Sequence, residues 1–396
     1  MTPMMEQYFE IKNKYKDFLL FYRLGDFYEM FFDDAILASR ELELTLTGRD
    51  CGEEERAPMC GVPYHSSETY IGRLIEKGYK VAICEQMEDP ALAKGLVRRD
   101  VTRVITPGTL IESNLLKETQ NNYLCAVFFD TEEIGVCFAD VSTGQAFATS
   151  FGGKEMLSKL NTELSTYMPS EIILNVSIES LPDRGQFIHE RVSSLISDNQ
   201  SMRFDYATSY DCVRDSFESE RSAWDGRKAV ICAIGGLLNY IAEMQKTDKT
   251  NIKDLKVYTN GQFMEIDVNS RRNLELCETM RTKEKRGSLL WVLDKTKTAP
   301  GARLLRQWVE HPLLKSSLII KRQSAVEELF ENFIKRQELE NLLSGVLDLE
   351  RLLTKIIYGT ANGKDLRAVC NTISVFPELK SLISDCKSEE IRKIFE

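Results

Sequence analysis

Residues 19–31 constrain the fold most tightly, because they predict two strands joined by a very short turn. Residues 18–22 are all apolar or aromatic, which is typical of a largely buried strand. Gly25 and Asp26 then interrupt the pattern. Glycine adopts positive φ angles and aspartate hydrogen-bonds its own backbone, so the two residues favour a turn.

The side chains that follow this turn suit either a binding site or an ordinary protein interior. Side chains two positions apart in a strand share a face, so Phe27 and Glu29 are expected together, with Tyr28 on the opposite face. An aromatic ring beside a carboxylate can insert between flat partners and hydrogen-bond the edge of what it displaces. Apolar residues are usually buried, and the residues alone therefore favour a core Phe27 and a solvated Glu29.

The composition indicates a soluble globular protein. Its 396 residues predict about two or three domains, and 43% hydrophobic and 28% charged residues are ordinary for such a chain. No apolar run approaches the roughly 18 residues of a membrane span, and the first residues show no secretory signal. Ten cysteines without a Cys-x-x-Cys pair and three histidines predict free thiols in a reducing cytosol and no zinc site.

The first 110 residues mix helices with strands. Thr2 and Pro3 are a typical N-cap and first helical residue. We expect helices at 3–16, 32–42 and 66–77, the strand pair at 19–31, a loop at 58–65 and a strand at 79–86. Because both kinds of element occur in so short a segment, it predicts one α+β domain.

One short segment is locally basic in a chain whose net charge is −10. Its one acidic residue is Asp100, and its basic residues are Lys94, Arg98, Arg99 and Arg103. Clustered cations suit phosphates, so these four side chains are a candidate phosphate-facing strip. A solvated loop face explains them equally well. The overall negative charge argues against a protein that coats nucleic acid non-specifically, but it does not exclude a local nucleic-acid-binding site.

Residues 123–174 predict a sheet with a flanking helix. We expect strands at 123–129, 134–141 and 145–151, a helix near 156–164 and a strand at 171–174. A meander of three strands followed by a helix and a further strand is typical of an α/β sheet of the ribonuclease H type.

Such a sheet raises the alternative that the chain is a nuclease. Asp130 and Asp140 lie at or near strand positions, where carboxylates can bind Mg²⁺ for phosphodiester cleavage. A two-metal site needs further converging carboxylates, and the sequence places no third one beside them. Asp130 is better explained as a turn residue, so the residues disfavour a nuclease.

From residue 225 the chain becomes helical. Apolar residues crowd nearly all sides of a helix at 229–244, which indicates deep burial. We expect short helices at 288–294 and 301–308 and longer ones at 319–333 and 347–358. Ten basic and five acidic residues occur between 267 and 306, so this segment also carries local positive charge.

Several motifs, in their order along the chain, resemble those of one family. They are Gly-Asp-Phe-Tyr-Glu at 25–29, Met-Cys-Gly-Val-Pro-Tyr-His at 59–65, Ala-Ile-Cys-Glu-Gln at 82–86, Thr-Pro-Gly-Thr at 106–109, Asp-Val-Ser-Thr-Gly at 140–144, Arg-Arg-Asn-Leu-Glu-Leu at 271–276, and 288–308. With these motifs essentially the whole chain resembles the bacterial DNA mismatch-recognition proteins of the MutS family. Cys60 and Pro300 stand where the family more often has alanine and methionine, and Pro300 is expected between two helices, where proline is tolerated.

The resemblance implies a multidomain α/β chain. Its parts are an α+β mismatch-binding domain at 1–108, a linker at 109–121, a ribonuclease H-like α/β connector at 122–248 and a truncated all-α core and lever domain at 249–396. The family's clamp and ATPase domains come later. Gly153-Lys154 and Gly363-Lys364 are not followed by serine or threonine, so neither is a phosphate-binding loop. We therefore expect an N-terminal fragment of a longer protein.

For the site, the resemblance implies that Phe27 enters the minor groove and stacks on a mispaired base, while Glu29 hydrogen-bonds that base. Unstacking costs on the order of a few kcal/mol per step. A mismatch is already weakly paired, so deformability is read more than base identity. The basic residues of the helical core would contact phosphates or lie near them, and Lys94, Arg98, Arg99 and Arg103 are possible contacts to the DNA backbone. No catalytic residue, metal or cofactor is expected in this chain, and ATP and Mg²⁺ belong to the ATPase domain of full-length members.

The resemblance also implies partners. Mismatched double-stranded DNA is the expected ligand, family members work as homodimers, and a MutL-type downstream repair protein is expected to dock on the connector. Because the ATPase domains supply much of the dimer contact, this chain alone is expected to be mainly monomeric. The expected setting is the bacterial cytoplasm, at the nucleoid and away from membranes. The alternative function is a protein-interaction module whose connector docks a repair partner, with incidental DNA contact.

Overall fold

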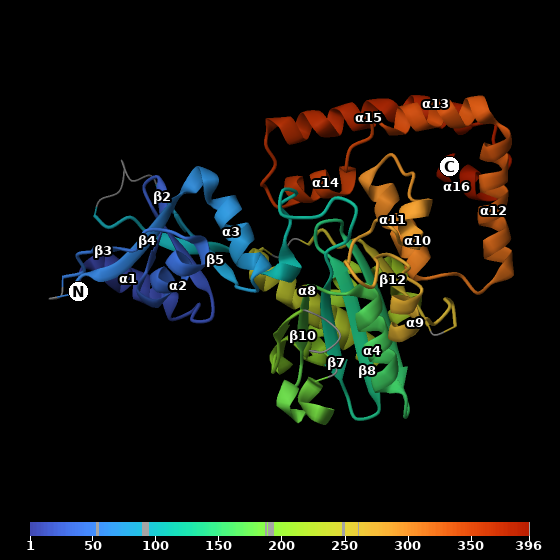
Figure 1. Cartoon of the computed structure of the whole chain (residues 1–396). Coiled ribbons are helices and arrows are strands. Elements are labelled where there is room, and N and C mark those ends of the chain that lie inside the picture. Colours follow the sequence, from blue (N-terminus) through green and yellow to red (C-terminus); the bar gives the residue numbers. More distant parts are fainter. Residues whose placement is uncertain are drawn as a thin grey trace.

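The chain folds into three parts in sequence order (Figure 1). The computed structural model describes residues 1–52, 55–88, 95–186, 188, 194–247, 250–259 and 261–395. The N-terminal part (blue) lies to one side, the middle part (teal to yellow) contains a second sheet, and the C-terminal part (orange to red) is helical. Two mixed domains followed by a helical one confirm the fold class expected from the sequence.

A six-stranded sheet of order β3-β4-β2-β1-β5-β6 forms the N-terminal part. Its elements are α1 (Pro3–Lys12), β1 (Leu19–Leu24), β2 (Phe27–Phe31), α2 (Phe32–Leu42), β3 (Thr47–Arg49), β4 (Ala57–Pro63), α3 (Ser67–Glu76), β5 (Val81–Gln86) and β6 (Arg99–Ile105). Alternate residues of β1 point to opposite faces: Leu20 and Tyr22 pack with α1, and Leu19 and Phe21 pack with α2 and α3. Helices therefore cover both faces of this sheet.

Two of these strands differ from the expectations. Residues 58–65 do not form a loop, because β4 pairs antiparallel with both β2 and β3. The basic segment is a strand from Arg99 onward, because Arg99–Ile105 is strand β6, paired with β5, whereas Arg98 precedes the strand. Strand β4 is held between β3 and the more distant β2, and β6 is held by β5, so local pattern alone reveals neither strand.

The middle part confirms the expected α/β sheet of the ribonuclease H type. Its elements are β7 (Leu124–Phe129), β8 (Glu133–Asp140), β9 (Gln145–Gly152), α4 (Met156–Tyr167), β10 (Glu171–Leu174), β11 (Leu195–Ser197), α6 (Tyr206–Ser216), α7 (Arg221–Trp224), α8 (Lys228–Gln245) and β12 (Asp254–Val257). The strand order is β11-β10-β7-β8-β9-β12, with α4 and the almost wholly buried α8 packed against the sheet. Strand β12 pairs with β9, so this part extends past the expected boundary at residue 248.

The remaining chain is helical, as expected. Its helices are α9 (Val268–Asn273), α10 (Leu289–Leu293), α11 (Ala299–Glu310), α12 (Ser316–Glu331), α13 (Phe333–Leu343), α14 (Leu349–Ile357), α15 (Gly363–Ile383) and α16 (Glu389–Phe395). Pro300 lies in the first turn of α11, not between helices, and proline is tolerated there because that turn's N–H groups have no helical partner. None of the helices formed by the described residues is both long and apolar enough to cross a membrane.

Candidate nucleic-acid interface

The loop between β1 and β2 places Phe27 at the tip of a hairpin. Leu24 pairs with Phe27, which leaves only Gly25 and Asp26 in the loop. Gly25 has a φ of +57°, and glycine suits the first position of such a two-residue loop because it tolerates positive φ. Phe27 is 47% exposed, whereas Tyr28 on the opposite face is buried. The interpretation of Phe27 as a core residue is therefore wrong, and its ring is available to a partner.

A second exposed aromatic residue, Tyr64, lies beside this tip. Strand β4 ends at Pro63, which pairs with Phe27, and the Tyr64 amide donates to the Asp26 carbonyl at 2.9 Å. The guanidinium carbon of Arg23 lies 3.7 Å from the centre of the Tyr64 ring, which is a cation–π contact. The hairpin tip is thus braced from its neighbouring strand. Sequence reasoning misses Tyr64 because it assigns these residues to a loop.

Glu29 lies on the same face as Phe27 and is held by an ion pair. Its carboxylate contacts the guanidinium of Arg49, the last residue of β3. The Glu29 side chain is only 17% exposed, so the interpretation of Glu29 as a solvated surface residue is also wrong. Sequence reasoning misses Arg49 because β3 has three residues and is defined only by its pairing with β4.

The four basic residues do not form one exposed strip. Arg99 is buried and donates to the carbonyls of Arg23 and Val97 at 2.8 and 3.0 Å. Arg103 pairs with Glu112, and burial lowers the pKa of Arg103 to about 10. Lys94 lies outside the described residues, and Arg98 is exposed.

The expectation that all four basic side chains face phosphates is therefore wrong for two of them. The side chains of Arg99 and Arg103 are already bound within the protein, whereas the contact expected of Arg98 stays a prediction.

The nuclease alternative finds no support in the positions of its carboxylates. Asp130 and Asp140 lie near opposite ends of β8. Asp130 sits in the turn before that strand, where it pairs with Lys228 at 2.7 Å. Asp140 is fully buried and accepts hydrogen bonds from both the amide and the hydroxyl of Ser142, at 2.9 and 2.6 Å. Both carboxylates therefore have structural partners.

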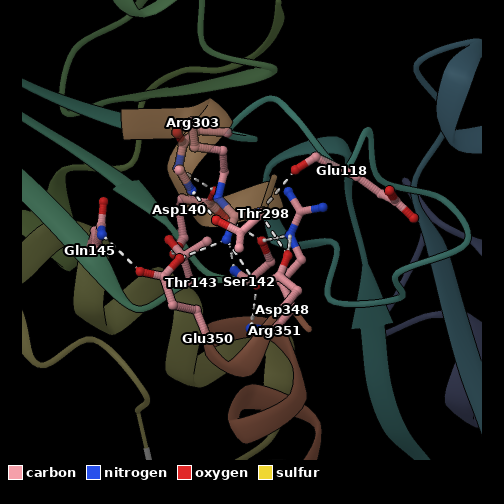
Figure 2. Close-up of polar contacts among 12 residues, drawn as sticks. Glu118, Asp140, Ser142, Thr143, Gln145, Thr298, Arg303, Asp348, Glu350 and Arg351 are labelled. Atoms are coloured by element: carbon pink, nitrogen blue, oxygen red, sulfur yellow. Dashed lines mark hydrogen bonds and ion pairs between the residues drawn. The ribbon is translucent and has the colours of Figure 1, made fainter. Parts of the chain in front are cut away.

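Two buried arginines of the helical part hold the linker in place (Figure 2). Arg303 is 4% exposed, and Arg351 is 2% exposed. Arg303 donates to the Glu118 carbonyl at 2.9 Å, and Arg351 donates to the carbonyls of Lys117 and Gln120 at 3.0 and 2.8 Å. The linker between the N-terminal part and the connector is thereby fixed to a third part of the chain.

The same arginines also contact acidic and polar side chains (Figure 2). Arg303 binds both oxygens of Asp348, at 2.7 and 2.8 Å, and Glu350 at 2.6 Å. Burial alone lowers the pKa of a guanidinium, but the hydrogen bonds and charges of these two carboxylates outweigh it and raise the pKa of Arg303. Arg351 reaches the connector, where it donates to the Ser142 hydroxyl at 3.1 Å.

Within the described residues, no cluster of His, Cys, Asp and Glu could hold a metal. The chain thus combines three parts in sequence order with an exposed aromatic residue at the hairpin tip of the first part. Family models match it in three places: MutS domain I at 2–114, MutS domain II at 122–253 and MutS domain III at 269–394. The chain belongs to the MutS family.

Several relatives are similar along almost the whole chain. The DNA mismatch repair protein MutS of Ruminiclostridium cellulolyticum is 48% identical over 391 residues, which are 99% of this chain and 45% of that protein. The protein of the same name from Acetivibrio thermocellus is 47% identical over 392 residues, 98% of this chain and 45% of that protein. The one from Clostridium novyi is 48% identical over 395 residues, 100% of this chain and 43% of that protein. The chain thus spans less than half the length of these relatives.

Proposed function

We propose that this chain recognises mismatched double-stranded DNA within a DNA mismatch-repair protein. One observation carries the proposal: Phe27 is exposed at a braced hairpin tip, in the part of the chain that matches MutS domain I, with Glu29 on the same face. The relatives bear the name DNA mismatch repair protein, and the resemblance assigns base contacts to these two residues.

In the proposed mechanism, the Phe27 ring enters the minor groove and stacks on a mispaired base, which kinks the duplex. Unstacking costs on the order of a few kcal/mol, and less is lost at a mismatch because its bases are already weakly paired. Glu29 then hydrogen-bonds the edge of the displaced base. The hairpin suits this task because β1 and β4 flank β2 on both sides and hold the ring's backbone in place.

The first experiment compares Phe27→Ala with Ile36→Ala, a matched control because Ile36 is an exposed apolar residue of the same domain. Stacking on a base contributes about 1–3 kcal/mol. Phe27→Ala should therefore reduce the preference for mismatched over paired duplex by about that amount, with little change in melting temperature because the ring is exposed. Ile36→Ala should keep the preference. A folded Phe27→Ala protein that still prefers mismatched DNA would contradict the proposal.

Equal affinity of the wild-type chain for the two duplexes would instead favour a protein-interaction module. The proposal also carries over the family's wider assembly: a homodimer, ATP and Mg²⁺ in another domain, a MutL-type partner on the connector, and a place at the nucleoid. By itself the 396-residue chain should then be mainly monomeric and catalyse no reaction. Light scattering and equilibrium ATP binding, both at micromolar protein, test these expectations.

A further inference from the structure

The Glu29–Arg49 ion pair crosses a strand that lies between its two partners. Glu29 is on β2 and Arg49 is on β3, with β4 between them in the sheet. On β4 the residue paired with Glu29 is Gly61, and the residue paired with Arg49 is Ala57. A β-carbon at Gly61 would lie 3.5 Å from the Glu29 Cγ. Gly61 thus presents no side chain next to Glu29, and Met59 is the residue of β4 that lies between Gly61 and Ala57 on the same face.

This pair lies directly beside the proposed wedge. Glu29 and Phe27 share a face of β2, and the Arg49 side chain keeps 37% of its surface exposed. Among the cations in the described part of the chain, Arg49 is the one within ion-pair distance of Glu29. In the free protein the carboxylate is therefore partly neutralised and held by a group that solvent, and hence a phosphate, can reach.

DNA presents each partner with a competitor. A backbone phosphate attracts the guanidinium of Arg49 and can accept two hydrogen bonds from it. A base edge can hydrogen-bond Glu29, but only when the base has been displaced from its stack. On paired DNA, opening the ion pair would leave Glu29 without a new partner and facing the phosphates. On mismatched DNA, both side chains gain a new partner: Arg49 a phosphate and Glu29 a base.

We propose that Arg49 is a positioning residue for Glu29, and that binding of a mismatch exchanges their ion pair for an Arg49–phosphate contact and a Glu29–base contact. On paired duplex the ion pair stays closed. The inference rests on the proposed function. It makes Arg49 a determinant of specificity, because the exchange is completed only where a base can be displaced.

The salt dependence of DNA binding reports the exchange. Each phosphate contact adds about 0.9 to the slope of log affinity against log salt concentration. Affinities of the 396-residue chain would be measured by fluorescence anisotropy on mismatched and paired duplexes of otherwise identical sequence, between about 50 and 200 mM salt. In the wild type, the slope should be steeper on mismatched DNA by about one contact.

Two variants should each make the slopes for mismatched and paired DNA equal, one by lowering the mismatched slope and the other by raising the paired slope. Arg49→Ala should lower the mismatched slope to the paired value, because the phosphate contact is lost. Glu29→Gln should raise the paired slope to the mismatched value, because Arg49 is then free to bind phosphate on either duplex. Arg49→Lys should keep the wild-type pattern, since lysine pairs with a carboxylate or a phosphate, and it tests the proposal even if Arg49→Ala fails to fold.

The control is Arg40→Ala. Arg40 is an exposed arginine of α2 that pairs with its neighbour Glu41 at 2.9 Å, and this substitution should change neither slope. If Arg49→Ala lowers both slopes equally, Arg49 is a permanent phosphate contact; if it changes neither, the ion pair is purely structural. Either result overturns the exchange.

The Phe27→Ala variant separates this inference from the proposed function. If Phe27→Ala abolishes the mismatch preference while the wild-type slopes are equal, only the exchange is wrong. If the preference survives Phe27→Ala, the proposed function itself is wrong.

Discussion

Two arginine–carboxylate contacts of this molecule use the same chemistry in different surroundings. At the hairpin tip, the Glu29 and Arg49 side chains are 17% and 37% exposed. At the junction of linker, connector and helices, Arg303 is 4% exposed, and its partners Asp348 and Glu350 are 20% and 33% exposed. Exposed pairs contribute about 0.2–1 kcal/mol, whereas removing one partner of a buried pair costs about 3–5 kcal/mol. Burial of the arginine thus distinguishes the pair that can exchange partners from the contact that holds the structure.

The largest effect is expected from breaking the buried contact. Arg303→Met should lower the free energy of unfolding by about 3–5 kcal/mol, because it removes four hydrogen bonds of a buried guanidinium, three of them to the carboxylates of Asp348 and Glu350. Urea unfolding followed by tryptophan fluorescence measures this, since Trp308 lies on the same helix. Arg214→Met is the control, because Arg214 is an exposed arginine of α6 paired with Asp211 and Asp215, and it should cause no measurable change. A loss below about 1 kcal/mol for Arg303→Met would remove the distinction between the two contacts.

A pH-dependent effect is expected at the interface between connector and helices. His311 lies 5.0 Å from the Tyr167 ring and 5.6 Å from the Phe263 ring, between centres, and its ring nitrogens have no hydrogen-bond partner among the described residues. Burial, together with the charge of Arg271, lowers the pKa of His311 to about 4. In the unfolded chain a histidine has a pKa of about 6.5. As the pH falls, the unfolded chain therefore takes up a proton at His311 at a higher pH than the folded chain does.

The contribution of His311 to stability is therefore full above about pH 6.5 and is lost as the pH falls through about 4. Its size follows from the two pKa values and is about 3 kcal/mol. The difference in unfolding free energy between wild type and His311→Leu should change by that amount between about pH 7.5 and 4. Burial raises the pKa of Glu163 to about 7, but this group is present in both proteins and cancels in the difference. A difference that is independent of pH would contradict the prediction.

The smallest effect is expected at the partly exposed Glu29–Arg49 pair. Glu29→Gln removes a negative charge next to the phosphates and leaves an amide that can hydrogen-bond a base. It should bind mismatched DNA at least as tightly as wild type and paired DNA about 1.4- to fivefold more tightly, which corresponds to the 0.2–1 kcal/mol of surface charge pairs. The preference for mismatched over paired DNA would then fall because paired DNA is bound more tightly. Weaker mismatch binding with unchanged affinity for paired DNA would show that the ionised carboxylate itself is needed.

Much of the architecture was predictable because local pattern and tertiary structure agree. The meander β7–β9, the buried helix α8 and the helical C-terminal part follow from runs of apolar residues with clear periodicity. The shared face of Phe27 and Glu29 follows from strand geometry and the turn at Gly25. Their roles could be expected only from the motifs, since an aromatic residue in a strand is ordinarily buried.

The sequence alone determined the strand–turn–strand at 19–31, the order of the three parts and the family to which the motifs belong. Tertiary structure decided which charges face solvent. Arg99 and Arg103 look available in a basic segment, but strand β6 places them against Arg23, Val97 and Glu112. Arg49 looks unremarkable, but β4, which pairs with both β3 and the distant β2, brings it to Glu29. The physical reason is that strand partners are chosen over long sequence separations, whereas a local pattern reports only which face of a strand is apolar.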